Sequence, residues 1–144
     1  MLGGRAAGCG EGGAMNRVRF ITHVGRRVLL IDLTDASPQE ILDTLDELEL
    51  VVAEQPQDSL LTLGDFTGAT FNKQAADRMK IVAAKDRPHV RRAAIVGLDS
   101  IPEVYYRNLL SFSARNIPAF KSREEALDWL LEEGQGQGKE AAAS

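Results

Sequence analysis

The chain has 144 residues, of which 44% are hydrophobic and 26% are charged, and its formal net charge is −4. This length is ordinary for one domain with one core, and the negative charge argues against general affinity for nucleic acid. The longest apolar runs fall far short of the roughly 20 residues that a bilayer-spanning helix needs. Composition therefore predicts a single globular domain with neither a membrane span nor a nucleic-acid partner.

Both ends of the chain lack the pattern of a folded domain. Residues 1–16 are rich in glycine and alanine, and residues 134–144 read GQGQGKEAAAS, so we predict a disordered leader and tail around a domain at 17–133. The small residues before Cys9 lack the apolar stretch of a lipoprotein signal. A single cysteine permits no intramolecular disulfide, which agrees with a cytoplasmic location. Translation could begin at Met1 or at Met15.

Strand-like segments recur along the central part of the chain. Residues 17–24 alternate as an edge strand does, and Gly25 and Arg26 are expected to form a tight turn after it. The near-continuous apolar runs at 27–33, 59–63 and 93–98 are typical of strands covered on both faces. A last short strand is predicted at 118–120.

Helix starts are marked by a serine followed three residues later by a glutamate, which is the pattern of a capping box. Ser37, Ser100 and Ser122 each open such a box. The stripes expected to be buried are Ile41, Leu45, Leu48 and Val52 in the first helix; Ile101, Tyr105, Leu109 and Phe112 in the third; and Ala126, Trp129 and Leu130 in the last. The second helix, at about 73–85, has the weaker stripe Ala75, Met79 and Val82 and no acidic start.

The predicted order is therefore β-β-α-β-α-β-α-β-α. Because helices separate the later strands, we expect an α/β fold with a mixed five-stranded sheet and four helices. The first strand should be antiparallel to its neighbour, and the remaining strands should be mostly parallel.

This order, the turn DFTGATF at 65–71 and the ending RNIPAF…EEALDWL at 115–130 resemble the STAS family, which includes the anti-sigma-factor antagonists with the SpoIIAA-like fold. They also resemble small bacterial proteins grouped with the CRAL-TRIO lipid-binding domains. The resemblance covers about residues 17–132. It implies a non-catalytic regulatory or protein-interaction domain in the bacterial cytoplasm. The CRAL-TRIO likeness implies instead a carrier or sensor of a small lipid-like or anionic ligand.

The resemblance also directs attention to the start of the second helix. In the antagonists, a partner kinase phosphorylates a serine there, whereas the matching positions here are Asn72, Lys73, Gln74 and Ala75. None of these carries a hydroxyl group, so the usual phosphoacceptor is missing. Phosphorylation of Thr67 or Thr70, which precede the helix, stays open.

An electropositive helix start can instead bind an anion or an acidic side chain of a partner. Lys73 adds to the positive end of the helix dipole, and Gly68, Thr70 and Asn72 would line the site. The alternative is that Thr70 or Asn72 only caps the helix. Tyr105 and Tyr106 add apolar surface to the third helix, for a pocket, a partner or the core. The candidate binding residues are Asp65, Thr67, Gly68, Thr70, Asn72, Lys73, Tyr105 and Tyr106.

Three aspartates, Asp32, Asp65 and Asp99, each end a predicted interior strand and should lie on one edge of the sheet. With Lys121, they suggest a receiver-like site in which Asp65 accepts a phosphoryl group beside Mg²⁺. The favoured alternative is that these carboxylates terminate strands by bonding to nearby N–H groups. We assign no catalytic residue, metal ligand or cofactor, and we do not expect an enzyme.

Charge is distributed unevenly between the first two helices. Residues 38–55 carry acidic side chains and no Lys or Arg, whereas residues 73–92 are predominantly basic. This pattern indicates either complementary patches for a partner or a homodimer, or attraction between neighbouring helices. A protein partner is the first functional hypothesis, and a small apolar or anionic ligand is the second.

Overall fold

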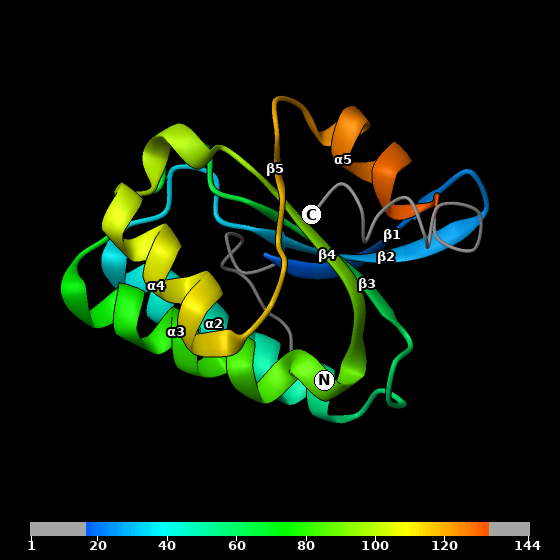
Figure 1. The fold of residues 1–144 in the computed structure, drawn as a ribbon, viewed down its shortest axis with the longest axis horizontal. Helices are drawn as coiled ribbons and strands as arrows, with labels where there is room; N and C mark the ends of the chain where they lie inside the picture. The colour runs from blue at the N-terminus through cyan, green and yellow to red at the C-terminus, as the bar shows by residue number, and fades with distance from the viewer. Residues whose placement is uncertain (1–16, 133–144) are drawn as a thin grey trace, which may run out of the picture.

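The computed structural model describes residues 17–132, in which a five-stranded sheet carries helices on both faces (Figure 1). The predictions made for residues 1–16 and 134–144, including those for Cys9 and Met15, lie outside the described residues. Within the described range, no helix is both long and apolar enough to cross a bilayer.

The strands lie in the sheet in the same order as in the chain, β1-β2-β3-β4-β5. β1 and β2 pair antiparallel, and the later pairs are parallel. This arrangement confirms the predicted mixed sheet. The strands are β1 (Val18–His23), β2 (Arg26–Asp32), β3 (Leu60–Asp65), β4 (Val90–Val96) and β5 (Ala119–Phe120).

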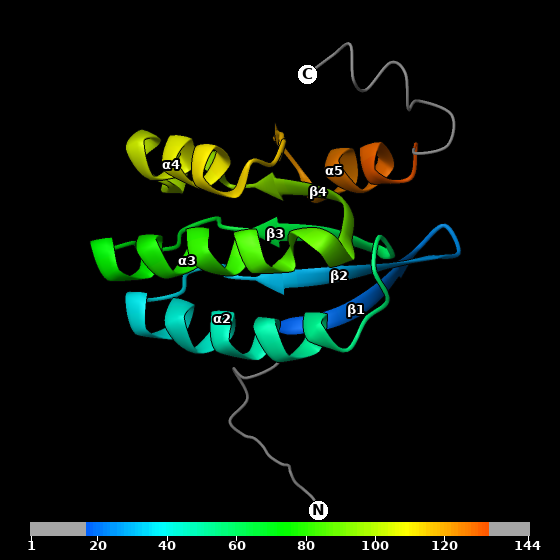
Figure 2. The same ribbon diagram turned by 60° about the horizontal axis from the view of Figure 1, so that its bottom comes forward.

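Four α-helices connect or follow these strands in residues 17–132, in the predicted order. They are α2 (Pro38–Ala53), α3 (Lys73–Asp86), α4 (Glu103–Ser113) and α5 (Arg123–Leu130). Two short 3₁₀ helices, η2 (Arg87–His89) and η3 (Leu98–Ser100), flank β4. α2, α3 and α4 form one layer (Figure 2), and α5 packs against the opposite face of the sheet.

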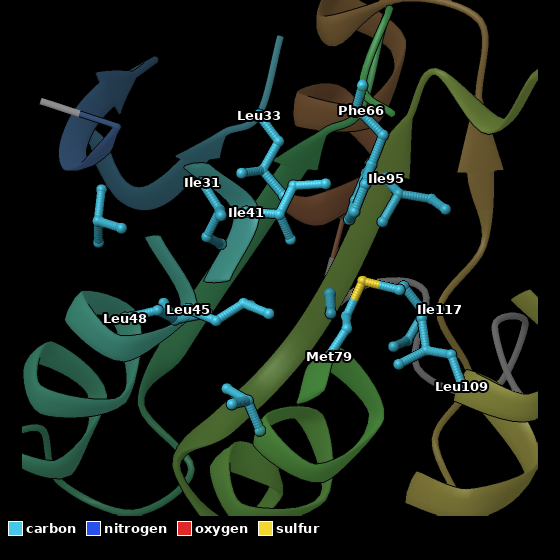
Figure 3. Packing of buried hydrophobic residues seen from close by; sticks show 14 of the residues in the cluster. Ile31, Leu33, Ile41, Leu45, Leu48, Phe66, Met79, Ile95, Leu109 and Ile117 are labelled. Atoms are coloured by element: carbon cyan, nitrogen blue, oxygen red, sulfur yellow. The ribbon is translucent and has the colours of Figure 1, made fainter. Parts of the chain in front are cut away.

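The two faces of the sheet have separate hydrophobic cores, which explains why the interior strands are continuously apolar. Under α2, α3 and α4, residues such as Ile31 and Ile95 meet helix side chains, and Met79 lies beside Leu109 and Ile117 (Figure 3). On the opposite face, the core contains Val28, Leu30, Leu61, Leu63, Ala94, Val96, Ala126, Leu127 and Leu130.

The three predicted capping boxes have different outcomes. The Ser37 box is present in full. Ser122 accepts the Glu125 N–H, but the Glu125 carboxylate accepts from Lys121 N–H rather than returning a bond to Ser122. The Ser100 box is wrong: α4 begins at Glu103, because the ring of Pro102 keeps the preceding residue extended.

Two further local predictions are wrong. The first turn consists of Val24 and Gly25, both at positive φ, and Arg26 already belongs to β2. In α4, the buried stripe runs from Leu109 to Ser113, four residues on, whereas Phe112 is 55% exposed. The Ser113 hydroxyl donates to the Leu109 carbonyl at 2.6 Å, which satisfies a polar group in the core.

Candidate functional site

The candidate edge is built from two turns of similar sequence, DLT at Asp32 and DFT at Asp65. Asp32 and Asp65 are register partners at the ends of β2 and β3. In each turn, one carboxylate oxygen accepts the threonine N–H, at 3.1 Å in the first turn and 3.0 Å in the second. It also accepts the threonine hydroxyl, at 2.6 Å from Thr34 and 2.7 Å from Thr67. Both aspartates therefore terminate strands by local bonding, as the favoured alternative predicts.

A guanidinium group from α5 joins the two carboxylates. Arg123 Nε lies 2.6 Å from Asp65 Oδ2, and Arg123 Nη2 lies 3.5 Å from Asp32 Oδ1. Although burial raises the pKa of Asp32, hydrogen bonds from Thr34 and the charges of Arg123 and Arg19 hold it below its usual value. The side chain between these carboxylates is thus a protein cation, in the place where a receiver-like site would hold Mg²⁺.

Other features of the receiver-like interpretation are dispersed. Asp99 lies exposed on η3, and Lys121 is exposed between β5 and α5. The part of the chain that the structure describes contains no group of three His, Cys, Asp or Glu side chains able to hold a metal ion.

Hydrogen bonds within the fold engage the backbone of the turn at 66–72. Gly68 N–H donates to Ser100 Oγ at 2.8 Å, and Thr70 N–H donates to the Ala36 carbonyl at 2.9 Å. The Asn72 side chain caps α3 by accepting the Ala75 N–H at 2.8 Å. These bonds occupy donors that an anion would need. The geometry therefore favours the capping alternative over an anion site in this turn.

The remaining candidates lie apart from this turn. Tyr106 turns toward the core, where its hydroxyl donates to the Ile117 carbonyl at 2.6 Å. Tyr105 is half-buried, and its ring centroid lies 6.5 Å from that of Phe71. Lys73 pairs with Asp77 across one helical turn, at 2.8 Å. The eight candidates thus divide among the sheet edge, the turn, the core and a groove.

This groove lies between α3 and α4 and has a volume of about 210 Å³. Its lining consists of Lys73, Ala76, Asp77, Lys80, Tyr105 and Asn108. Beside it, the Lys80 ammonium group lies 5.2 Å from the ring centroid of Phe112. We call the groove and Phe112 together the α3–α4 face. It combines the exposed Lys73 and the half-buried Lys80 with the exposed ring of Phe112 and the half-buried ring of Tyr105.

α2 and α3 contrast in charge, and acidic side chains of α2 form ion pairs with basic side chains of α3. Arg78 contacts Asp46 at 3.0 Å and Glu49 at 2.6 Å. Lys85 contacts the other Glu49 oxygen at 2.7 Å. Attraction between neighbouring helices therefore accounts for much of this pattern.

Sequence reasoning missed a cavity of about 80 Å³ between the sheet and α3. Its lining is mostly apolar, but it includes Asp86 at the end of α3 and Arg115 after α4. Leu109 is the one residue of α4 in this lining. The carrier hypothesis expected Tyr105 and Tyr106 to line a cavity, and they do not line this one. Burial raises the pKa of Asp86 to about 6, against the opposing charge of Arg115. The sequence did carry one signal: a carboxylate at a helix C-terminus opposes the helix dipole.

The pKa of Asp86 predicts a pH-dependent stability. A carboxyl group with a pKa of about 6 in the folded state, against its usual 3.8, binds its proton more tightly when folded. The contribution of Asp86 to stability should therefore fall as pH rises from about 4 to 6 and then level off. We expect Asp86→Asn to match the wild type near pH 4 and to exceed it near pH 7 by on the order of 2 kcal/mol, after allowance for solvent screening.

Urea unfolding at several pH values measures this difference. Asp77→Asn, an exposed carboxylate on the same helix, serves as the control and should show no such gain toward neutral pH. Parallel pH profiles for the wild type and Asp86→Asn would contradict the prediction.

The described fold and edge define a small α/β domain without an assembled metal centre in residues 17–132. The model of the SpoIIAA-like family matches residues 30–131, and the chain belongs to this family. Among the similar solved structures is an uncharacterized protein of the DUF3478 family with a SpoIIAA-like fold from Shewanella loihica PV-4. It is 20% identical, with a TM-score of 0.61, and the alignment covers 78% of this chain and 91% of that chain. At this identity, the likeness shows the fold alone. A comparison with curated proteins gives no match.

Proposed function

We propose that this SpoIIAA-like domain is a non-catalytic interaction module that binds a protein partner through the α3–α4 face. The observation that carries the proposal is the exposure of Phe112, at 55%, beside the groove that contains Lys73 and Lys80. Contiguous exposed apolar surface rimmed by polar groups is typical of interaction sites.

The chemistry of the α3–α4 face favours a partner segment that is acidic and carries an apolar anchor. Lys73 and Lys80 present two cations, and Asp77 is already engaged by both, at 2.8 and 3.7 Å. The aromatic rings of Tyr105 and Phe112 supply the apolar contact. Aromatic residues with adjacent cations commonly dominate binding energy at such surfaces.

The domain should act without catalysis, because its polar groups near the edge serve the fold. The Thr67 hydroxyl donates to the Asp65 carboxylate, which also accepts from Arg123 Nε. Gly68 and Asn72 are engaged in the turn and the helix cap. These bonds give the edge a structural role, and they support a domain that acts without catalysis.

The double variant Lys80→Glu/Phe112→Ala tests the proposal. With the full chain as bait in lysate of its own host, this variant should capture the partner at least tenfold more weakly, about 1.4 kcal/mol. Lys73→Glu alone should weaken capture less, and high salt should weaken capture by the wild type.

A matched control changes the same kinds of residue elsewhere: Lys121→Glu/Val24→Ala alters an exposed lysine and an exposed apolar residue away from the groove. It should retain capture. Equal capture by both double variants and the wild type would overturn the proposed surface. Sedimentation of the purified chain shows whether the partner is a second copy.

A further inference from the structure

The cavity under α3 exists because small side chains lie where the two central strands face this helix. Thr62 and Gly64 of β3 and Ala93 of β4 line it, opposite Met79 and Val82. Gly64 leaves the middle of the strand without a side chain, and a Cβ there would lie 2.8 Å from the Phe66 ring. A larger residue at position 64 therefore could not fill this space unless the Phe66 ring moved.

Partly exposed residues mark the mouth of the cavity. Ala83, Val90 and Arg115 are half-buried, whereas the deeper lining residues, such as Leu33, Leu45 and Val82, are buried. Asp86 lies at the same end as Ala83 and Val90. The cavity thus has an apolar interior and a mouth that carries both a carboxylate and a guanidinium group.

Asp86 is placed at a cost to the fold. It is 6% exposed, and among the described residues no hydrogen bond or ion pair within 4 Å engages its carboxylate. It also ends α3, where the helix dipole disfavours a negative charge. Its oxygens are not among the fully enclosed polar atoms that lack a partner, so they keep some access to solvent, but partial desolvation of a charged group is still unfavourable. A ligand that donates to this carboxylate would remove part of that cost.

Arg115 is held in position on the other side of the mouth. Its Nη1 donates to the Ala83 carbonyl at 3.1 Å, which anchors the side chain to the last turn of α3. Its remaining N–H groups can donate to a carboxylate, which suits their planar geometry. Asp86 and Arg115 attract each other electrostatically, yet they make no ion pair within 4 Å in the described structure. A head group carrying both charges can therefore bridge them.

Two other charged groups near Asp86 are engaged elsewhere in the fold. Glu49 faces it from α2 but is itself engaged by Arg78 and Lys85. His89 faces it from η2, and its Nδ1 lies 2.8 Å from the Gln55 carbonyl. The charged side chains that line the mouth are those of Asp86 and Arg115, and exposed Arg87 adds a second positive charge that acts on Arg115.

We propose that this cavity binds a small aliphatic α-amino acid as its zwitterion. The side chain enters the apolar interior, the ammonium group binds Asp86, and the carboxylate binds Arg115. The volume of about 80 Å³ is roughly half that of the engineered lysozyme cavity that binds benzene, so it suits a branched group of roughly three or four carbons. This site is separate from the α3–α4 face, and its ligand is independent of the protein partner.

Three ligands that share one isopropyl body separate the contributions of the two charges. L-Valine carries both charges, isobutylamine carries only the cation, and isovalerate carries only the anion. In NMR titrations of the full chain, L-valine should shift the amide signals of Gly64, Ala83 and Ala93. The two singly charged ligands should bind at least about tenfold more weakly, because each leaves one protein charge without a partner.

Variants at the mouth make the test specific. Asp86→Asn should weaken valine binding at least about tenfold and should strengthen isovalerate binding, because a repelling carboxylate is gone. If Asp86 had a purely structural role, Asp86→Asn would not change the preference for L-valine over isovalerate. Ala83→Leu should block entry, whereas Ala84→Leu, one residue along the same helix and outside the lining, should bind as the wild type does.

Thermal unfolding of each variant confirms that the fold is retained, and the Ala83→Leu and Ala84→Leu pair tests the site without changing charge. The proposal is overturned if about 10 mM L-valine shifts no cavity signal. It is also overturned if Asp86→Asn keeps the wild-type order of preference among the three ligands, or if Ala83→Leu binds valine as well as Ala84→Leu.

Discussion

Gly97→Ala should lower the free energy of unfolding by at least about 3 kcal/mol. Gly97 has φ +83, and a Cβ on it would lie 2.7 Å from the Phe66 carbonyl carbon and 2.8 Å from Thr67 Cα. Both atoms belong to the backbone of the turn after β3, which cannot move aside without breaking its bonds to β4 and to Ser100. Urea unfolding followed by circular dichroism measures the loss.

Gly25→Ala provides the matched control, because Gly25 also has positive φ, +77, but a Cβ there meets nothing within 4 Å. Gly25→Ala should lower the free energy of unfolding by only about 1 kcal/mol, which is the cost of the left-handed backbone conformation itself. Similar losses in the two variants would show that close packing of the turns does not determine the effect at Gly97.

Asp65→Ala is the second substitution expected to have a large effect, with a loss of about 3 kcal/mol. The aspartate is 6% exposed and joins β3 to α5 through Arg123 at 2.6 Å. Its removal also frees the Thr67 N–H and hydroxyl, which bond to it in the wild type. Because we assign Asp65 to the fold, partner capture measured below the unfolding transition should be unchanged.

Asp77→Ala removes the same side chain from an exposed pair, with Lys73 at 2.8 Å, and should cost less than about 1 kcal/mol. Denaturant unfolding of the two variants side by side tests the contrast. An Asp65→Ala protein that is as stable as Asp77→Ala but fails to capture the partner would assign Asp65 to binding and contradict our interpretation.

Most of the fold could be predicted because its determinants are local in the sequence. Ser37 and Glu40 form their capping box within one helical turn, and Asn72 caps α3 in the same way. The continuous apolar character of residues 60–65 reflects burial on both faces. Such patterns depend on neighbours within a few positions, so they can be recognised without knowledge of tertiary contacts.

The errors arose where tertiary contacts overrode local patterns. Ser100 has the spacing of a helix cap, but Pro102 delays the start of α4 to Glu103, and the Ser100 hydroxyl accepts instead from Gly68, 32 residues away in the chain. Phe112 has the spacing of a buried stripe, but the neighbouring position Ser113 faces the core. A serine that is able to cap a helix, or a phenylalanine on a helix, does not specify which tertiary neighbour it will meet.

Arg123, Arg115 and Asp86 were not predicted from the sequence, because their contacts lie far away in the chain. Arg123 reaches Asp65 across 58 residues, and Arg115 reaches Ala83 across 32. Arg123 and Asp86 did give a local signal, because a basic residue begins α5 and an acidic residue ends α3. Both placements oppose the helix dipole, and such conflicts often mark positions fixed by tertiary contacts.

The strand order has a consequence for which part of the molecule can open alone. Each parallel crossover advances one strand in the same direction, and crossovers of one hand then place α2, α3 and α4 on the same face. No strand of the described residues follows α5, so this helix is not part of a crossover. Its detachment would break the Arg123–Asp65 pair and uncover the apolar surface of β3 and β4, but it would leave every crossover in place.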